Sequence, residues 1–141
     1  MMPLYLPDHS RAQLETMARA GYPLETCGLL LGLPRRDGCE VRRVAQARNL
    51  NQERAHDRYE LDPQDFLQID ESARAEGLEV VGVWHSHPDH PARPSETDRA
   101  AAWEGWSYVI VSVTSDGMTE LRCWRLNSEQ FVEEPIEPCP R

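Results

Sequence analysis

The chain has 141 residues, of which 40% are apolar and 28% charged, a size and composition typical of one folded domain rather than a disordered segment. Its formal net charge of −9 disfavours nucleic acid and anionic lipid as partners. The longest apolar run, Cys27 to Leu33, is too short to span a bilayer, and the first residues lack the basic segment of a signal peptide. We therefore expect a cytoplasmic protein with no membrane partner.

The first part of the chain predicts a helix followed by a β-hairpin. Apolar residues along 8–20 fall on one face of a helix, and Gly21 is a natural end for it. Residues 27–33 form a short apolar run between turn-forming residues, which indicates a buried strand. The turn signal Asp37-Gly38 then leads into a second strand over 39–47.

A polar segment separates this hairpin from the next helix. Residues 48–58 have no apolar periodicity, so we expect a loop there. Asp62 and Pro63 have the residue types of an N-cap and a first helical position, and Gly77 would end that helix. Residues 78–85 are rich in valine and predict a central strand.

The last part of the chain alternates between loop, helix and strands. It predicts a proline-rich loop over 86–94, a short helix over 95–103, strands over 107–113 and 118–126, and a final strand over 131–136. This order indicates an α/β (α+β) fold, in which a mixed β-sheet is flanked by helices. We assign residues 1–136 to this single domain and residues 137–141 to a loose, proline-rich tail.

The four cysteines do not indicate a zinc knuckle, because none of them belongs to a C-x-x-C pair. Cys27 and Cys123 lie in apolar runs and are expected to be buried free thiols, whereas Cys139 lies in the tail and is expected to be exposed.

The segment Trp84-His85-Ser86-His87-Pro88 carries the main chemical signal. His85 and His87 are two residues apart, so in a strand their side chains point to the same face and can bind one metal ion. Asp98 falls in the first turn of the following helix, where its carboxylate can supply a third ligand. Two histidines and one carboxylate, with a fourth position left for water, are typical of a catalytic rather than a structural zinc site.

Each part of this pattern also has a simpler interpretation. An H-x-H pair by itself is more often two surface histidines, and Ser95-x-x-Asp98 also fits a helix capping box. We favour the metal site because these residues occur together, after an apolar strand and a loop stiffened by prolines. His90 is expected to line the cleft rather than to bind the metal.

The arrangement H-S-H-P, followed by seven residues to Ser95 and three more to Asp98, resembles the signature of the JAMM (MPN+) metalloproteases. The sequence matches this signature at every defining position. The family also has a glutamate just before an early strand, and Pro23 to Gly32 matches that context around Glu25. The similarity covers residues 5–126, including Arg58-Tyr59-x-Leu61-Asp62-Pro63 and Tyr108-Val109-Ile110-Val111-Ser112.

This resemblance implies a cytidine-deaminase-like JAMM/MPN fold and a zinc metallopeptidase or isopeptidase that holds one Zn²⁺ per chain. His85, His87 and Asp98 would be the metal ligands. Glu25 would be the general base, and Ser95 would donate a hydrogen bond to the oxyanion. Without the resemblance, Glu25 would be taken for a solvated surface charge.

The resemblance also suggests a substrate. Short, stand-alone prokaryotic members are similar to enzymes that act after the C-terminal Gly-Gly of ubiquitin-like sulfur-carrier proteins, so we expect such a carrier or its conjugate as partner. The alternative is a non-catalytic MPN-type scaffold, because relatives of this fold that lack the ligands are structural subunits. A nucleoside deaminase would need H-x-E and P-C-x-x-C, and the sequence contains neither.

Overall fold

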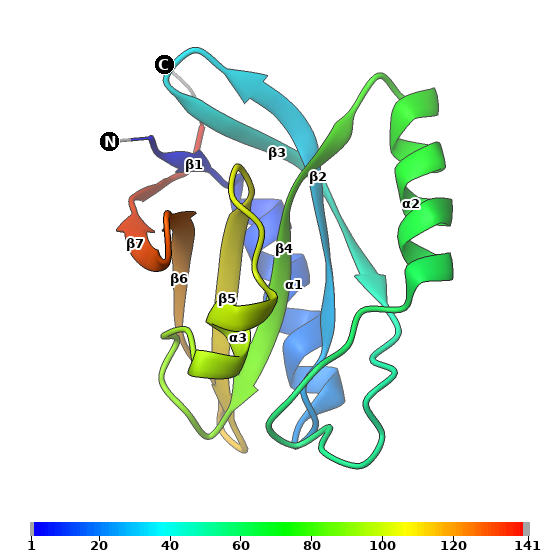
Figure 1. Ribbon diagram of the computed structural model, residues 1–141, viewed down its shortest axis with the longest axis vertical. Helices are drawn as coiled ribbons and strands as arrows, with labels where there is room; N and C mark the ends of the chain where they lie inside the picture. The colour runs from blue at the N-terminus through cyan, green and yellow to red at the C-terminus, as the bar shows by residue number, and fades with distance from the viewer. Residues whose placement is uncertain (1, 140–141) are drawn as a thin grey trace.

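The computed structural model describes residues 2–139, in which eight strands form one mixed sheet (Figure 1). The strand order across the sheet is β7-β6-β5-β4-β2-β3-β1-β8. The strands are β1 (Leu4–Tyr5), β2 (Cys27–Arg35), β3 (Gly38–Ala47), β4 (Glu79–Pro88), β5 (Ser107–Thr114), β6 (Gly117–Asn127), β7 (Gln130–Glu134) and β8 (Ile136–Glu137). The central strand β4 pairs antiparallel with β2 and parallel with β5.

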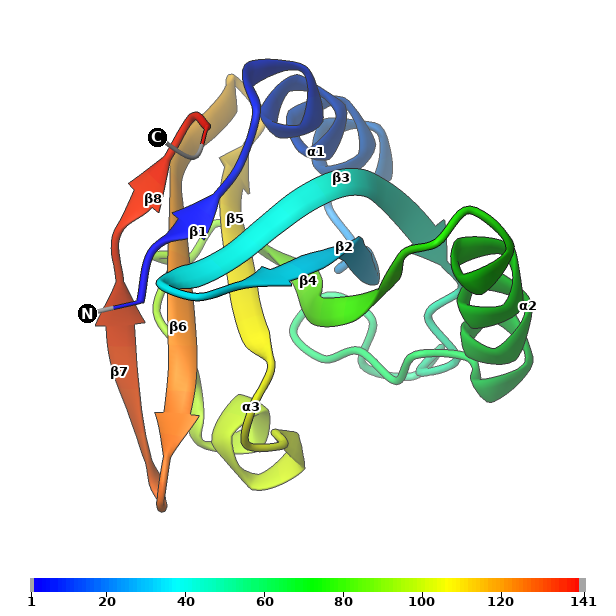
Figure 2. The ribbon, with the colours of Figure 1, turned by 90° about the horizontal axis from the view of Figure 1, so that it is seen from above.

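Helices cover both faces of this sheet. The helix α1 (Asp8–Gly21) packs Leu14 and Ala18 on one face, and α2 (Pro63–Ala75) packs Phe66 and Ala73 on the other. The short helix α3 (Glu96–Ala101) lies on the face opposite α1, as the two views show (Figure 1 and Figure 2). Among the described residues, no helix combines the length and the apolar character that a membrane crossing requires.

Trp84 fixes which side chains of β4 point to each face of the sheet near the C-terminal end of the strand. Its buried indole belongs to the apolar core on the α1 side, and its Nε1 donates a hydrogen bond to the Ala45 carbonyl at 3.0 Å. A Cβ at Gly28 would overlap both that carbonyl and the indole, so only glycine fits at this point of β2. Because side chains alternate along a strand, Val83 and His85 then face the α2 side.

The element order predicted from the sequence is confirmed, with differences at the ends. β4 continues to Pro88 instead of ending at His85, because β5 pairs with it along this stretch and the Ser86 amide donates to the Thr26 carbonyl at 2.9 Å. Ser95 is the N-cap of α3 rather than its first residue. The two-residue strand β1 was not predicted, since so short a strand has no readable alternation.

The C-terminal end is paired with the N-terminal strand. Pro135 separates β7 from β8, so the single strand predicted over 131–136 is two strands. Glu137, which we assigned to the loose tail, belongs to β8 and pairs with Tyr5 of β1. The Glu137 carbonyl accepts a hydrogen bond from the Leu6 amide at 2.7 Å. The end of the predicted tail, residues 140 and 141, lies outside the described residues.

Candidate metal centre

His85 and His87 point to the same side of the sheet at the end of β4. Their Nε2 atoms are 3.1 Å apart, and both side chains are buried. The neighbouring strands hold this end firmly, since His85 is paired with Cys27 of β2 and His87 with Ser112 of β5. Ser86 points away and accepts a hydrogen bond from the Thr26 amide at 2.9 Å, so the alternation predicted for this strand is confirmed.

Asp98 reaches the two histidines from the first turn of α3. Its Oδ2 atom lies 3.1 Å from Nε2 of His87 and 3.3 Å from Nε2 of His85. The same oxygen accepts a hydrogen bond from the Ser95 amide at 2.8 Å, and the Asp98 amide donates to Ser95 Oγ at 3.0 Å. The predicted capping box is therefore present, and it also orients the carboxylate toward the histidines.

Further contacts orient the imidazole rings. Nδ1 of His87 lies 2.8 Å from the Pro91 carbonyl, which can only accept, so Nδ1 carries the proton and the Nε2 lone pair faces the cluster. The ring of Tyr59 stacks on His85 with centroids 4.5 Å apart. Nδ1 of His85 has no hydrogen-bond partner among the described residues.

The donor set fits a metal ion. One ligand atom from each of His85, His87 and Asp98 lies within 4.8 Å of the others. Burial favours the neutral form of Asp98, but its hydrogen bonds with the histidines outweigh burial and hold the pKa of this carboxyl well below its usual range. Burial lowers the pKa of His85, so this ring is neutral and can act as a ligand. Two imidazole nitrogens and one carboxylate in a tight cluster can bind a divalent metal.

The Asp98 carboxylate favours the protonated form of His87. Burial would lower its pKa, but the hydrogen bonds with Asp98 and the Pro91 carbonyl and the charges of Asp98 and Glu25 together offset burial, so the pKa of His87 is raised. The point where the three ligand atoms converge thus attracts a positive charge, either a proton on His87 or a metal ion.

Glu25 lies opposite His87, just before β2. The register that pairs Cys27 with His85 continues through the hydrogen bond from the Ser86 amide to the Thr26 carbonyl, which brings Glu25 level with His87. The Glu25 side chain is buried, and its Oε1 atom has no hydrogen-bond partner among the described residues. Burial raises the pKa of Glu25 to about 8, so the carboxyl is suited to hold and release a proton near neutral pH.

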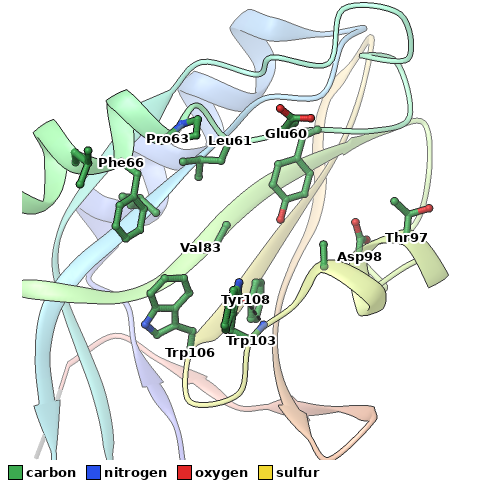
Figure 3. Close-up of a pocket in the computed structure, with 14 residues that line it drawn as sticks. Glu60, Leu61, Pro63, Phe66, Val83, Thr97, Asp98, Trp103, Trp106 and Tyr108 are labelled. Atoms are coloured by element: carbon green, nitrogen blue, oxygen red, sulfur yellow. Dashed lines mark hydrogen bonds between the residues drawn. The ribbon is translucent and has the colours of Figure 1, made fainter.

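Two cavities adjoin the cluster, and Thr97 lines both of them. The larger has a volume of about 680 Å³ and lies between α2, α3 and the sheet. Its walls are mostly apolar, and Figure 3 shows Thr97 and Asp98 together at one end, away from Phe66 and Trp106. The smaller, called the polar cavity below, has a volume of about 290 Å³ and is lined mainly by polar and charged residues, among them Glu25, Asp57, His87 and Ser95.

The structure brings all five residues singled out from the sequence to one place. His85, His87 and Asp98 form the cluster, and Glu25 and Ser95 line the polar cavity beside it. His90 also lines that cavity and is not part of the cluster, as expected. The stacking of Tyr59 on His85 was not foreseen, because Tyr59 stood out only as part of a family-like motif, and nothing in that motif indicates ring contact.

Comparison with known proteins places the chain in a family. The family model described as "Prokaryotic homologs of the JAB domain" (Prok-JAB) matches residues 7–127. The chain is 35% identical to the desampylase of Haloferax volcanii over 137 residues, which cover 92% of each protein. It is 33% identical to the CysO-cysteine peptidase of Mycobacterium tuberculosis over 120 residues, which cover 84% of this chain and 80% of that relative.

Solved structures of other proteins share the fold of this chain. A protein from Desulfitobacterium hafniense superposes with a TM-score of 0.84 at 30% identity, over 94% of this chain and 90% of that one. A protein from Salinibacter ruber superposes with a TM-score of 0.76 at 40% identity, over 99% of this chain and 92% of that one. The resemblance to JAMM proteins is thereby confirmed, and the chain belongs to the Prok-JAB family, the prokaryotic homologues of the JAB domain.

Proposed function

We propose that the protein is a zinc-dependent peptidase or isopeptidase that hydrolyses the amide bond after the C-terminal Gly-Gly of a ubiquitin-like or sulfur-carrier protein. The observation that carries the proposal is the convergence of His85, His87 and Asp98 beside the buried, unpartnered carboxyl of Glu25. The relatives named desampylase and CysO-cysteine peptidase support an activity on carrier proteins. A non-catalytic scaffold would have no need for this convergence. The buried free thiols of Cys27 and Cys123 suit a reducing cytoplasm.

Five residues would carry out the hydrolysis, namely the three metal ligands, Glu25 and Ser95. His85, His87 and Asp98 would hold the zinc ion, which would supply a Lewis acid that polarises the carbonyl and makes water a better nucleophile. Glu25 takes a proton from the attacking water and passes it to the amine as the C–N bond breaks. The hydroxyl of Ser95 accepts a hydrogen bond from the Asp98 amide through its oxygen, which leaves its proton free to stabilise the carbonyl oxygen as negative charge develops.

The carrier tail approaches through the apolar cavity. This cavity is lined by Asp98, and one wall comes from residues 59–61, which follow the loop predicted over 48–58. Its volume and apolar walls suit part of a protein better than a small polar group. Glycines at the scissile end of the tail have no Cβ, so their backbone can come close to the cluster.

Tail specificity tests this function. We expect kcat/KM for a carrier ending in Gly-Gly plus one amino acid to exceed that for the same carrier ending in Ala-Ala plus that amino acid by at least about tenfold, or about 1.4 kcal/mol of transition-state binding. The reason is that methyl groups would hold the tail backbone away from the metal centre. Equal rates for the two tails would instead identify a general peptidase.

A further inference from the structure

Two arginines line the polar cavity. Arg58 does so from the loop before α2, and Arg93 from the loop between β4 and α3. Within residues 2–139, neither guanidinium makes a hydrogen bond or an ion pair. Elsewhere in the same range ten arginines pair with carboxylates: Arg19, Arg35, Arg42, Arg43, Arg48, Arg54, Arg74, Arg99, Arg122 and Arg125. Arg11 and Arg36 are the other two described arginines without a carboxylate partner, and neither of them lines this cavity.

The nearest acids do not neutralise this pair. Asp57 lies close enough to Arg58 for its pKa to be affected, but Arg54 holds its carboxylate through two hydrogen bonds of 3.2 Å and 2.6 Å. The charge of Arg93 likewise contributes to lowering the pKa of Glu120. The Glu120 carboxylate, however, already forms an ion pair with Arg122, whose Nε atom lies 3.2 Å from Oε2. Glu25 and Asp57 also line this cavity, but among residues 2–139 no carboxylate forms a hydrogen bond or an ion pair with Arg58 or Arg93.

The position of this cavity suits the leaving group. The apolar cavity is lined by Asp98 and the polar one by His87, and Thr97 lines both, so a substrate cleaved at the cluster can extend into both cavities. The carrier takes the apolar cavity under the proposed function, which leaves the polar one for the amine. About 290 Å³ lies at the lower end of the range for ligand pockets and suits a single amino acid.

We propose, resting on the proposed function, that Arg58 and Arg93 bind the free carboxylate of the departing amino acid. The preferred substrate is then a carrier tail extended by one α-amino acid in an ordinary peptide bond, rather than a carrier joined to a lysine side chain. Guanidinium groups bind carboxylates through paired, charge-assisted hydrogen bonds. In a terminal amino acid one carbon separates this carboxylate from the scissile nitrogen, so both groups stay in the polar cavity.

A carrier joined to a lysine side chain through an isopeptide bond has no free carboxylate next to the scissile nitrogen. Four methylene groups separate the scissile nitrogen from the lysine backbone, whose carbonyl is uncharged within a chain. Hydrolysis of either substrate adds water across the C–N bond, so the carrier leaves with a Gly-Gly carboxyl and the amine takes the proton. The two substrates therefore differ in binding on the leaving side and not in the chemistry.

The test compares three carriers that share the Gly-Gly tail: one extended by alanine with a free carboxylate, one extended by alaninamide, and one linked to the side chain of a lysine within a peptide. We expect the wild-type protein to cleave the free-carboxylate carrier with a kcat/KM at least about tenfold above either of the others, as loss of a charge-assisted pair predicts. The double variant Arg58→Gln, Arg93→Gln should lose this preference, so that its kcat/KM values for the free-carboxylate and alaninamide carriers come within about twofold of each other.

Arg36→Gln is the matched control, because Arg36 is exposed in the turn after β2, at the end of that strand remote from Cys27. Arg93→Gln alone, at an exposed position, serves if the double variant does not fold. Equal loss on all three carriers in the double variant, or a wild-type preference for the isopeptide, would overturn the inference. Absence of cleavage of every Gly-Gly carrier by the wild-type protein would instead refute the proposed function.

Discussion

Replacing Glu25 with glutamine is expected to lower kcat by about 10²- to 10⁴-fold while metal content and melting temperature stay close to those of the wild-type protein. Glutamine has nearly the same shape as glutamate but cannot carry a proton from water to the leaving amine. Glu25 lies opposite His87 and outside the ligand cluster, so the change leaves all three ligand atoms in place. Steady-state kinetics together with elemental analysis of the same sample measure both expectations.

Glu53→Gln is the matched control, since Glu53 is an exposed carboxylate in the loop after β3. It should leave kcat unchanged. A Glu25→Gln variant that retains its turnover would remove this carboxyl from the mechanism. A variant that loses both turnover and metal would make Glu25 a support of the metal site rather than the proton carrier.

The double variant His85→Ala, His87→Ala is expected to reduce the zinc content from about one per chain to near zero. Asp98 alone offers a single carboxylate, which is too weak a site to retain the ion. Because metal binding to the native state stabilises it, added zinc should raise the melting temperature of the wild-type protein and not that of the variant. Elemental analysis and thermal unfolding with and without zinc test these expectations.

His90→Ala provides the comparison, since His90 lines the same cavity but does not belong to the cluster. It should retain the full zinc content. Equal zinc retention in the double variant would show that the metal binds elsewhere.

The strands that carry the site were predictable because their signals are local. The alternation of side chains along 78–85 placed His85 on the face opposite Trp84, and the structure confirms this arrangement. The capping interpretation and the ligand interpretation of Asp98 turned out to be compatible, because the carboxylate that accepts from the Ser95 amide is also 3.1 Å from His87.

Features that depend on distant contacts were not predictable in the same way. Glu25 lies beside the metal-binding cluster only because β2 pairs antiparallel with β4, which brings together residues sixty positions apart. Family resemblance alone therefore singled it out. Arg58 and Arg93 lie on separate loops, and nothing in the sequence of either loop indicates that they line one cavity. The strand β8 was missed because its partner β1 lies at the other end of the chain.

Zinc titration of protein stripped of metal by a chelator tests the proposed function most directly, with the cleavage of a Gly-Gly-tailed carrier followed by intact mass. We expect no cleavage after chelation, and a rate that rises to its full value at about one equivalent of zinc per chain. The product should end in a free Gly-Gly carboxyl. Undiminished cleavage by the chelated protein, or cleavage at a bond other than the one after Gly-Gly, would contradict the proposed function.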